Sequence, residues 1–473
     1  MAQTNHPTPE TLQRLITAAG DGGWTRDQAR IAPHLTEWRE RFHGATPLLL
    51  MPSSVAAIAS IVRICNDTRT AIVPQGGNTG LAGGQIPNPN GNEILLSLSR
   101  LDRVRTIDPL ANTMTVEAGA ILQHVQRQAD AHDRLFPLSL ASEGSATIGG
   151  LVSTNAGGTG VLAYGNMREL VLGLEAVLPS GEIWNGLTGL RKDNTGYDLK
   201  QLFIGAEGTL GIVTSATLKL FPRPAAIETA IAAVNDLQSA VALLSFALSR
   251  GAITAFELIP RRGLDFVLQH IPATRDPLDR AWPWLVLIDV SLRAASQSGT
   301  AQDLLTSAAR ASLIVDGTIA QSLTQREAFW KLRHSISEAQ KPEGGSIKHD
   351  VSVPISSIPR FIDEASRAVI AAMPGARPVP FGHIGDGNIH FNISQPVGAD
   401  KAAFLNRAPE INRLVHDIVH SLGGSVSAEH GIGQAKIDEI SRYKSPAALE
   451  TMRTIKRALD PLGIMNPGKV VRV

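Results

Sequence analysis

Four side chains in the C-terminal part of the chain have types that suit catalysis. Two are histidines, His383 and His390, in the stretch 381–392, and two are adjacent, Glu429 and His430. Imidazole nitrogens and carboxylate oxygens are ordinary ligands of zinc and similar divalent ions. An imidazole that binds no metal can move a proton near neutral pH. Three of the four side chains suit a metal ion and the fourth suits a base, so the pattern favours an enzyme.

Short strands and tight turns are expected to position these side chains. His390 and Asn392 are two residues apart in a predicted strand over 388–393, so both point to the same face. A compact turn at 385–387 places His383 on the other side of it. Glu429 and His430 precede a Gly-x-Gly turn at 431–433. On these residues alone, a hydrogen-bonded structural role for each histidine remains an alternative.

Three glycine-rich loops precede this region, at 74–84, 142–158 and 205–211. Consecutive Gly and Asn residues can point several backbone N–H groups into one concavity, which suits a pyrophosphate. A single loop of this kind would be explained as a tight turn, but three predict a large bound cofactor. The stretch 158–163 matches a Rossmann G-x-G-x-x-A pattern, yet Tyr164-Gly165-Asn166 follows where the helix should run. We therefore expect a different cofactor scaffold.

Composition limits the classes of partner. The chain has 473 residues, which predicts two or three domains, and its 44 basic and 43 acidic residues give a net charge of +1. This balance predicts neither a nucleic acid nor an anionic membrane as partner. The single cysteine, Cys65, cannot form an internal disulfide. With no signal peptide, transit peptide or membrane-spanning stretch recognised, a cytoplasmic location is expected.

The pattern of predicted elements changes at the two prolines in 221–224, which indicates a domain boundary. Before it, a helical lead-in over 1–44 is followed by short strands and glycine loops, including a hairpin at 174–184. Beyond it, strands alternate with long helices, which predicts an α+β domain with an antiparallel sheet. The strands are expected at 253–258, 284–290, 378–381 and 388–393, and the helices at 298–311, 324–340, 355–373, 400–421 and 446–458.

The glycine loops resemble the FAD-binding domain of the vanillyl-alcohol oxidase and p-cresol methylhydroxylase type. The motifs at 383–392 and 429–433 resemble the FAD-dependent D-2-hydroxyacid dehydrogenase branch, and the segment 190–205 resembles the D-2-hydroxyglutarate dehydrogenases in particular. The resemblance implies an α+β protein with a two-subdomain FAD-binding domain at 1–223 and a substrate or cap domain at 224–424. A C-terminal helical segment at 425–473 is implied to complete the active site and to pack on the FAD domain.

The resemblance implies FAD as the cofactor. The loop at 74–84 contains no His or Cys, so the flavin is expected to be bound non-covalently. The residues implied to contact FAD are Pro74, Gly76, Gly77, Asn78, Thr79, Gly80, Leu81, Gly84, Ser142, Glu143, Gly144, Ser145, Ile148, Gly149, Asn155, Gly157, Gly158, Gly165, Glu207, Gly211, Ile212 and Asn466.

The resemblance also divides the four opening side chains by role. His383, His390 and Glu429 match the ligands of a divalent metal, which is expected to be zinc and to polarise the substrate hydroxyl. His430 matches the general base. The implied reaction is the oxidation of D-2-hydroxyglutarate or a close D-2-hydroxyacid, with hydride transfer to flavin N5.

Four further residues are implied to bind the substrate. Arg333 matches a carboxylate-binding arginine, Lys348 a substrate lysine and Asn392 a polar contact, whereas Ser337 stands where the relatives have threonine. D-Lactate is the alternative substrate, and a metal-dependent hydrolase is the alternative from another class. Electron-transfer flavoprotein, a quinone or a cytochrome is expected to accept the electrons, and a homodimer is plausible on the resemblance.

Overall fold

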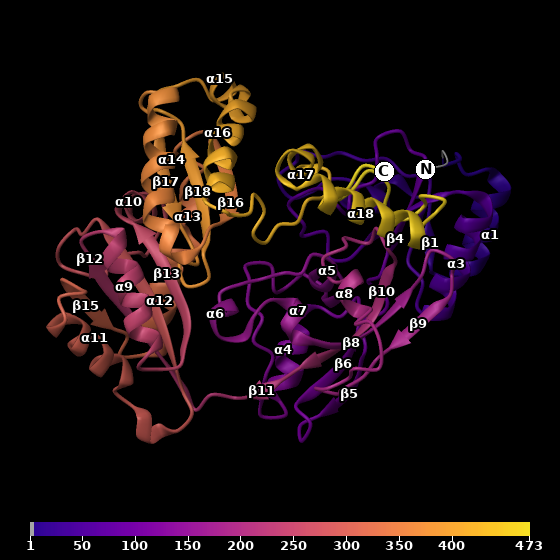
Figure 1. Cartoon of the computed structure of the whole chain (residues 1–473). Helices are drawn as coiled ribbons and strands as arrows, with labels where there is room; N and C mark the ends of the chain where they lie inside the picture. The colour runs from indigo at the N-terminus through magenta and orange to yellow at the C-terminus, as the bar shows by residue number, and fades with distance from the viewer. Residues whose placement is uncertain (1–3) are drawn as a thin grey trace. The chain divides into compact units, whose positions relative to one another are not determined.

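The computed structural model describes residues 4–473, which form two compact units (Figure 1). Unit 1 holds the chain up to Gly158 together with Gly165–Arg223 and Glu429–Val473. Unit 2 holds Thr159–Tyr164 and Pro224–Ala428. The sequence placed residues 159–164 and 425–428 in other segments. They belong to unit 2 because Leu162 lies against Gly385 and because Ser425 forms a backbone bridge with Ser352.

The first part of unit 1 is a small sheet covered by helices. The strands lie in the order β1-β2-β4-β3, and all neighbours except β1 and β2 run parallel. Ser54 accepts the N–H of Ala57 and so caps α3, whose Ile58, Ile61 and Cys65 are buried in the core beneath the sheet. The elements are α1 (Pro9–Ala19), β1 (Trp24–Thr25), α2 (Gln28–Ile31), η1 (Ala32–His34), β2 (Leu49–Leu50), α3 (Val55–Thr68), β3 (Ala71–Gln75) and β4 (Glu93–Ser97).

The second part of unit 1 is a five-stranded antiparallel sheet in the order β5-β6-β10-β8-β9. The pairing of β8 with β9 confirms the expected hairpin. The elements are β5 (Val104–Asp108), β6 (Thr113–Glu117), α4 (Leu122–Asp130), β7 (Arg134–Leu135), α5 (Ile148–Ser153), α7 (Met167–Leu170), β8 (Val171–Val177), β9 (Ile183–Gly186), α8 (Lys200–Phe203), β10 (Ile212–Lys219) and β11 (Phe221–Pro222).

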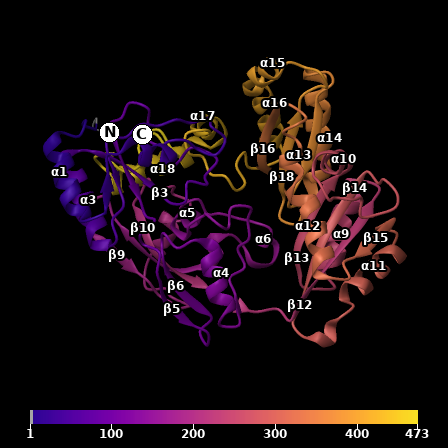
Figure 2. The same ribbon diagram turned by 180° about the vertical axis from the view of Figure 1, so that it is seen from behind.

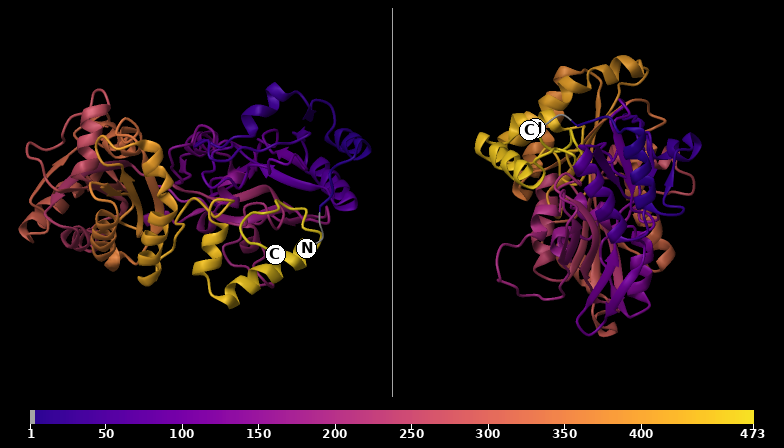
Figure 3. Two further views of the ribbon diagram at one scale, coloured as in Figure 1. Left: turned by 90° about the horizontal axis from the view of Figure 1, so that it is seen from above. Right: turned by 90° about the vertical axis from the view of Figure 1, so that its right-hand side faces the viewer.

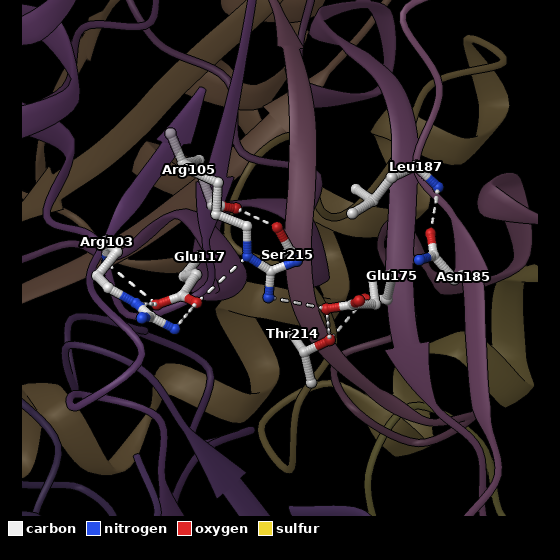
Figure 4. Close-up of polar contacts among 9 residues, drawn as sticks. Arg103, Arg105, Glu117, Glu175, Asn185, Leu187, Thr214 and Ser215 are labelled. Carbon is white, nitrogen blue, oxygen red and sulfur yellow. Dashed lines mark hydrogen bonds and ion pairs between the residues drawn. The ribbon is translucent and has the colours of Figure 1, made fainter. Parts of the chain in front are cut away.

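One face of this sheet carries a network of charged residues (Figure 4). The Arg105 guanidinium donates to Glu117 over 3.2 Å and to Glu175 over 3.1 Å, and Thr214 donates to Glu175 over 2.9 Å. Both carboxylates are almost fully buried. Burying a carboxylate is costly unless it is paired, so the network joins β5, β6, β8 and β10 into one rigid layer.

The C-terminal segment adds α17 (Ile437–Tyr443) and α18 (Pro446–Leu459) to unit 1 (Figures 1 and 3). Met465 forms a parallel bridge with Ile72 at the edge of β3. The buried ammonium of Lys456 donates to the carbonyls of Thr209 and Met465 over 2.6 and 2.8 Å, and to Asp460 over 2.6 Å. These bonds tie the tail to the glycine loop at 205–211.

Unit 2 contains a four-stranded antiparallel sheet, β13-β14-β12-β15, and a three-stranded antiparallel sheet, β16-β18-β17. Ile231, Leu287 and Ile259 of the larger sheet pack with residues of α10, α12 and α13 in one core. The strands are β12 (Ala226–Val234), β13 (Ile253–Pro260), β14 (Trp284–Leu292), β15 (Asp316–Ile319), β16 (Ser346–Ser352), β17 (Arg377–Phe381) and β18 (Asn388–Ser394). The helices are α6 (Val161–Tyr164), α9 (Leu237–Leu248), α10 (Arg261–His270), η2 (Ala295–Gln297), α11 (Thr300–Arg310), α12 (Leu323–His334), α13 (Ile336–Ala339), η3 (Ile355–Ser357), α14 (Ile358–Ala372), α15 (Lys401–Asn406) and α16 (Ala408–Ser421).

The two faces of the three-stranded sheet differ in character. Helices α14 and α16 lie side by side and cover one face (Figures 1 and 2), where Phe361 packs against Phe391. Strand alternation sends the next residues to the other face. Cross-strand pairing therefore places Lys348 beside Asn392, and Asp350 beside His390, on the face that the two helices leave uncovered.

Three sequence predictions differ from the structure in detail. The helix expected over 324–340 is two helices, because the chain breaks at Ser335. The helix expected from about 400 to 421 is also two, divided at Arg407. The lead-in over 1–44 contains a strand as well as helices, with residues 1–3 outside the described part. Within residues 4–473, no helix has both the length and the apolar character needed to cross a bilayer.

Candidate active site

The predicted cofactor loops are in direct contact with one another in unit 1. A Cβ on Gly77 would stand 1.8 Å from the carbonyl oxygen of Ser145 in the second loop. A Cβ on Gly208 would stand 2.4 Å from Pro74 Cγ, which brings the third loop against the first. Only glycine permits these approaches, so the glycines of the three loops have a common structural reason.

Asn466 connects the tail to these loops. Its side-chain nitrogen donates to the Gly84 carbonyl over 2.9 Å and to the Glu207 carbonyl over 2.7 Å. Asn78, Asn155, Glu207 and Asn466 all have left-handed backbones, with φ between 42° and 54°. Such conformations are costly for non-glycine residues and gather at binding sites. All four were among the residues expected to contact the cofactor.

Two buried polar atoms test whether the loops fit FAD. Thr147 Oγ1 and Asn466 Oδ1 find no hydrogen-bond partner among residues 4–473. Buried polar atoms are almost always satisfied, and FAD offers a partner of the right kind for each: the Thr147 hydroxyl can donate to a phosphate oxygen, and the Asn466 amide oxygen can accept from a hydroxyl or ring N–H group of the cofactor. The donors, the close backbone approaches and the orphaned atoms fit FAD. The other residues predicted to contact it lie in the same unit: Gly76, Thr79, Gly80, Leu81, Ser142, Glu143, Gly144, Ile148, Gly149, Gly157, Gly158, Gly165, Gly211 and Ile212.

The Glu207 side chain holds the loop that follows His430. Its two oxygens accept the backbone N–H groups of Ile432 and Gly433 over 2.7 and 2.9 Å. Burial raises the pKa of Glu207 to about 7, although the two N–H donors and the nearby charges of Lys436 and Lys469 act in the opposite direction. Glu207 was predicted to contact FAD, and its carboxylate is engaged by the tail.

In unit 2, a buried carboxylate joins two of the predicted site residues. Glu257 accepts Arg333 Nε with one oxygen and His383 Nδ1 with the other, each over 2.6 Å. Burial by itself would raise the pKa of Glu257, but the charges and hydrogen bonds of His383 and Arg333 hold it well below its usual range. The ion pair takes the Nε–H of Arg333, one of five donors on the guanidinium.

The two metal-binding candidates in unit 2 lie together. The rings of His383 and His390 are 5.4 Å apart and meet edge to face. Asp350 Oδ1 lies 3.9 Å from His390 Nδ1, and Asn388 donates to the same carboxylate over 3.0 Å. Phe381 packs against His390 with ring centroids 5.2 Å apart. A carboxylate therefore stands next to each imidazole, as is usual for histidines that bind metals.

The predicted substrate residues occupy the same unit. The amide nitrogen of Asn392 donates to Gln340 over 2.7 Å, and Lys348 pairs with Asn392 across the two strands. The guanidinium of Arg333 lies 4.9 Å above the Phe381 ring. Ser337, in α13, is half-buried and lies four positions after Arg333, beyond the break at Ser335.

Glu429 and His430 begin the last segment of unit 1, directly after Ala428. The N–H of Ala428 donates to the carbonyl of Asp350 in β16 over 3.2 Å. Asp350 is also the residue that pairs with His390 across the sheet. The donor set of two imidazoles and one carboxylate suits zinc or a similar divalent ion. His383 fits this role, because a neutral ring with its hydrogen on Nδ1, directed at Glu257, has its lone pair on Nε2, the nitrogen that would bind a metal.

Comparison with known proteins tests the cofactor and the fold. Residues 46–186 match a family model described as "FAD binding domain", and residues 223–470 match "FAD linked oxidases, C-terminal domain". Two relatives are a mitochondrial D-2-hydroxyglutarate dehydrogenase of Arabidopsis thaliana, 36% identical over 96% of this chain and 80% of its own length, and a D-2-hydroxyglutarate dehydrogenase of Stutzerimonas stutzeri, 33% identical over 98% and 99%. The chain belongs to the D-2-hydroxyglutarate dehydrogenase family of FAD-linked oxidoreductases.

Solved structures agree on the architecture of this family member. The p-cresol methylhydroxylase structure with bound substrate has a TM-score of 0.75 and 17% identity, and it covers 97% of this chain and 96% of its own. An alkyldihydroxyacetonephosphate synthase has a TM-score of 0.74 and 17% identity over 98% and 86%. These likenesses confirm the α+β fold with an FAD-binding domain of p-cresol methylhydroxylase type.

Sequence reasoning missed three residues of this FAD-dependent oxidoreductase. Glu257 stands inside the apolar strand β13, and a carboxylate in such a strand is a signal of a buried ion pair. Thr147 lies in the second glycine loop and could have been included with its neighbours. No local sequence pattern indicates a role for Gln340, because its hydrogen bond to Asn392 joins positions that are 52 residues apart.

Proposed function

We propose that this chain oxidises D-2-hydroxyglutarate, or a close D-2-hydroxyacid, to the corresponding 2-oxoacid. The observation that carries the substrate class is the group of polar side chains in unit 2. Arg333 and Lys348 offer two cationic groups, and Asn392 offers an amide next to Lys348. Two cations suit an acid with two carboxylates better than one with a single carboxylate, because each carboxylate gains a charge-assisted hydrogen bond.

Each chain residue has a proposed task. Arg333 and Lys348 hold carboxylates, Ser337 and Asn392 provide neutral polar contacts, and the imidazole of His430 takes the hydroxyl proton. His383, His390 and Glu429 would hold a divalent ion, with zinc as the first choice. When bound, FAD supplies the acceptor for the C2 hydride at N5, and the metal supplies polarisation of the hydroxyl oxygen. Orientation of the substrate is the work of the surrounding protein.

A panel of D- and L-2-hydroxyacids tests the proposal, with an artificial dye as electron acceptor. D-2-Hydroxyglutarate should give a higher kcat/KM than D-lactate, and the L-isomers should be poor substrates. A clear preference for D-lactate would contradict the choice of the diacid. Ser337 is the residue to examine first in that event, because it carries one methyl group less than the threonine expected there.

The physiological acceptor and the assembly are also proposals. Family resemblance favours electron-transfer flavoprotein, a quinone or a cytochrome as acceptor, and a homodimer is compatible with it. The hydrolase alternative loses support because the family match is to FAD-binding domains. A purified protein without flavin absorption bands would restore it.

A further inference from the structure

Glu257 is a carboxylate in the middle of an apolar strand. Its neighbours in β13 include Phe256, Leu258 and Ile259, and its own exposed fraction is 1%. Removing a carboxylate from water is costly unless hydrogen bonds and opposite charges compensate. An apolar residue would pack at this position without that cost. The position therefore demands an explanation beyond packing.

The two partners of Glu257 come from different elements. Arg333 lies near the end of α12, and His383 lies in the turn between β17 and β18. Each donates a 2.6 Å hydrogen bond to a different oxygen of the carboxylate. One side chain thus fixes two groups that are 50 positions apart in the sequence. We propose that Glu257 is a positioning residue that holds the metal-binding histidine and the carboxylate-binding arginine in one rigid array.

The backbone next to this array supports the geometry. Leu258 and Gly382 form a reciprocal pair of backbone hydrogen bonds, over 2.8 and 3.1 Å. Glu257 and His383 are the immediate neighbours of these two residues. The strand and the turn are therefore joined both by backbone and by side chains, which limits the freedom of the His383 ring.

The carboxylate also selects the tautomer of His383. Ionised Glu257 can only accept, so the ring must carry a hydrogen on Nδ1, and in its neutral form the lone pair is then on Nε2. A carboxylate in this position strengthens metal binding by orienting the ring and raising its basicity. Asp350 stands farther from His390, at 3.9 Å, so Glu257 makes the shorter contact of the two.

This inference rests on the proposed function, and it adds a structural link between the two ends of the substrate. The hydroxyl end depends on the metal that His383 would hold, and a carboxylate depends on Arg333. Because both donors share Glu257, the spacing between the two subsites is fixed by one side chain. Loss of Glu257 should therefore weaken metal binding and carboxylate binding together.

The test compares Glu257→Gln with Glu343→Gln in the flavin-loaded protein. Glu343 is a matched control, because it also bridges a histidine and an arginine in unit 2: His270 over 2.6 Å, and Arg377. Affinity for Zn²⁺ or Co²⁺ is measured by competition with a chelator, and affinity for 2-oxoglutarate by the change in flavin absorbance. We expect Glu257→Gln to weaken metal binding by about 10- to 100-fold and to weaken 2-oxoglutarate binding as well, while Glu343→Gln keeps both affinities near wild type.

Wild-type affinity for both ligands in Glu257→Gln would overturn the proposal, as would a wild-type protein that binds no divalent ion. If Glu257→Gln does not fold, the same affinities are measured in Glu257→Asp. In addition, ¹⁵N NMR of the metal-loaded wild type determines the tautomer of His383. Nδ1–H with Nε2 on the metal is expected, and the opposite tautomer overturns the proposal. Metal affinity does not depend on which acid is oxidised. A substrate other than D-2-hydroxyglutarate would contradict the proposed function, but it would not change the metal affinities expected here.

Discussion

Gly433 donates its backbone N–H over 2.9 Å to Glu207, a residue 226 positions earlier in the chain. Ile432 donates to the other oxygen of the same carboxylate. The loop after His430 is thereby fixed to the glycine loop at 205–211. The residue proposed as base stands two positions from this anchor, so the protonation state of Glu207 bears on how firmly the base is held.

The first prediction concerns the pH dependence of stability. The pKa of folded Glu207 is about 7, above its ordinary value of 4.5, so the folded state binds more protons than the unfolded state between these values. This contribution to stability is full below pH 4.5 and is lost as pH rises through 7, by about 3 kcal/mol. Glu207→Gln should gain stability relative to wild type by about this amount between pH 5 and pH 8. Urea unfolding at several pH values measures the difference, and exposed Glu10→Gln is the control. Parallel curves for Glu207→Gln and wild type would refute the prediction.

The second prediction concerns the contact between the first two glycine loops. In Gly77→Ala the new methyl group would overlap the Ser145 carbonyl, so the loops must separate. Overpacking of this kind costs about 1–3 kcal/mol, and we expect most of the bound flavin to be lost. Gly189→Ala is the control, because its Cβ would meet only the Thr113 side chain, at ordinary contact distance, with Cγ2 at 3.6 Å as the nearest atom. The flavin-to-protein ratio and the Tm are measured. Full flavin occupancy in Gly77→Ala would show that the loops tolerate separation.

The third prediction is that FAD dissociates when the protein is denatured. The first loop offers neither His nor Cys for a covalent link. Burial raises the pKa of the Cys65 thiol to about 12, so this cysteine is not a reactive thiolate. After acid precipitation the yellow colour should stay in the supernatant. A yellow pellet would reveal a covalent link.

The fourth prediction concerns the metal. His383→Ala and His390→Ala should each lose the bound divalent ion, because each removes one of three proposed protein ligands. Exposed His420→Ala, in α16, should keep it. Elemental analysis of the purified variants gives the metal content. Chelation of the wild type should abolish turnover, and turnover that persists after complete metal removal would contradict the metal-assisted mechanism.

The fifth prediction separates the diacid from the monoacid. Lys348→Met should lower kcat/KM for D-2-hydroxyglutarate by about 10- to 100-fold, the value of a hydrogen bond to a charged group. D-Lactate offers no second carboxylate, so its kcat/KM should change less. Lys401→Met, at an exposed helix start, is the control. Equal losses for both acids would remove Lys348 from the role of binding the second carboxylate.

Local patterns predicted much of the architecture. Alternation of apolar residues gave β13, β14 and β18, and the glycines at 385 and 387 gave the turn that carries His383. Local patterns could not predict long-range pairs of side chains. Glu257, for example, bonds to Arg333 and His383, which are 76 and 126 positions away in the sequence. The short helix α6 was missed for a related reason. Its packing partner, β13, is remote in sequence, and a helix of four residues has no periodicity to detect.

Neither unit is a single continuous stretch of chain. The polypeptide passes between them at 158–159, 164–165, 223–224 and 428–429. A protease that cuts only after Arg223 would therefore give two fragments, 1–223 and 224–473, each of which contains residues of both units. Expression of residues 224–428 alone would likewise omit α6 from its place on β13. Exchange of one unit between relatives therefore requires that its separate short segment is exchanged with it.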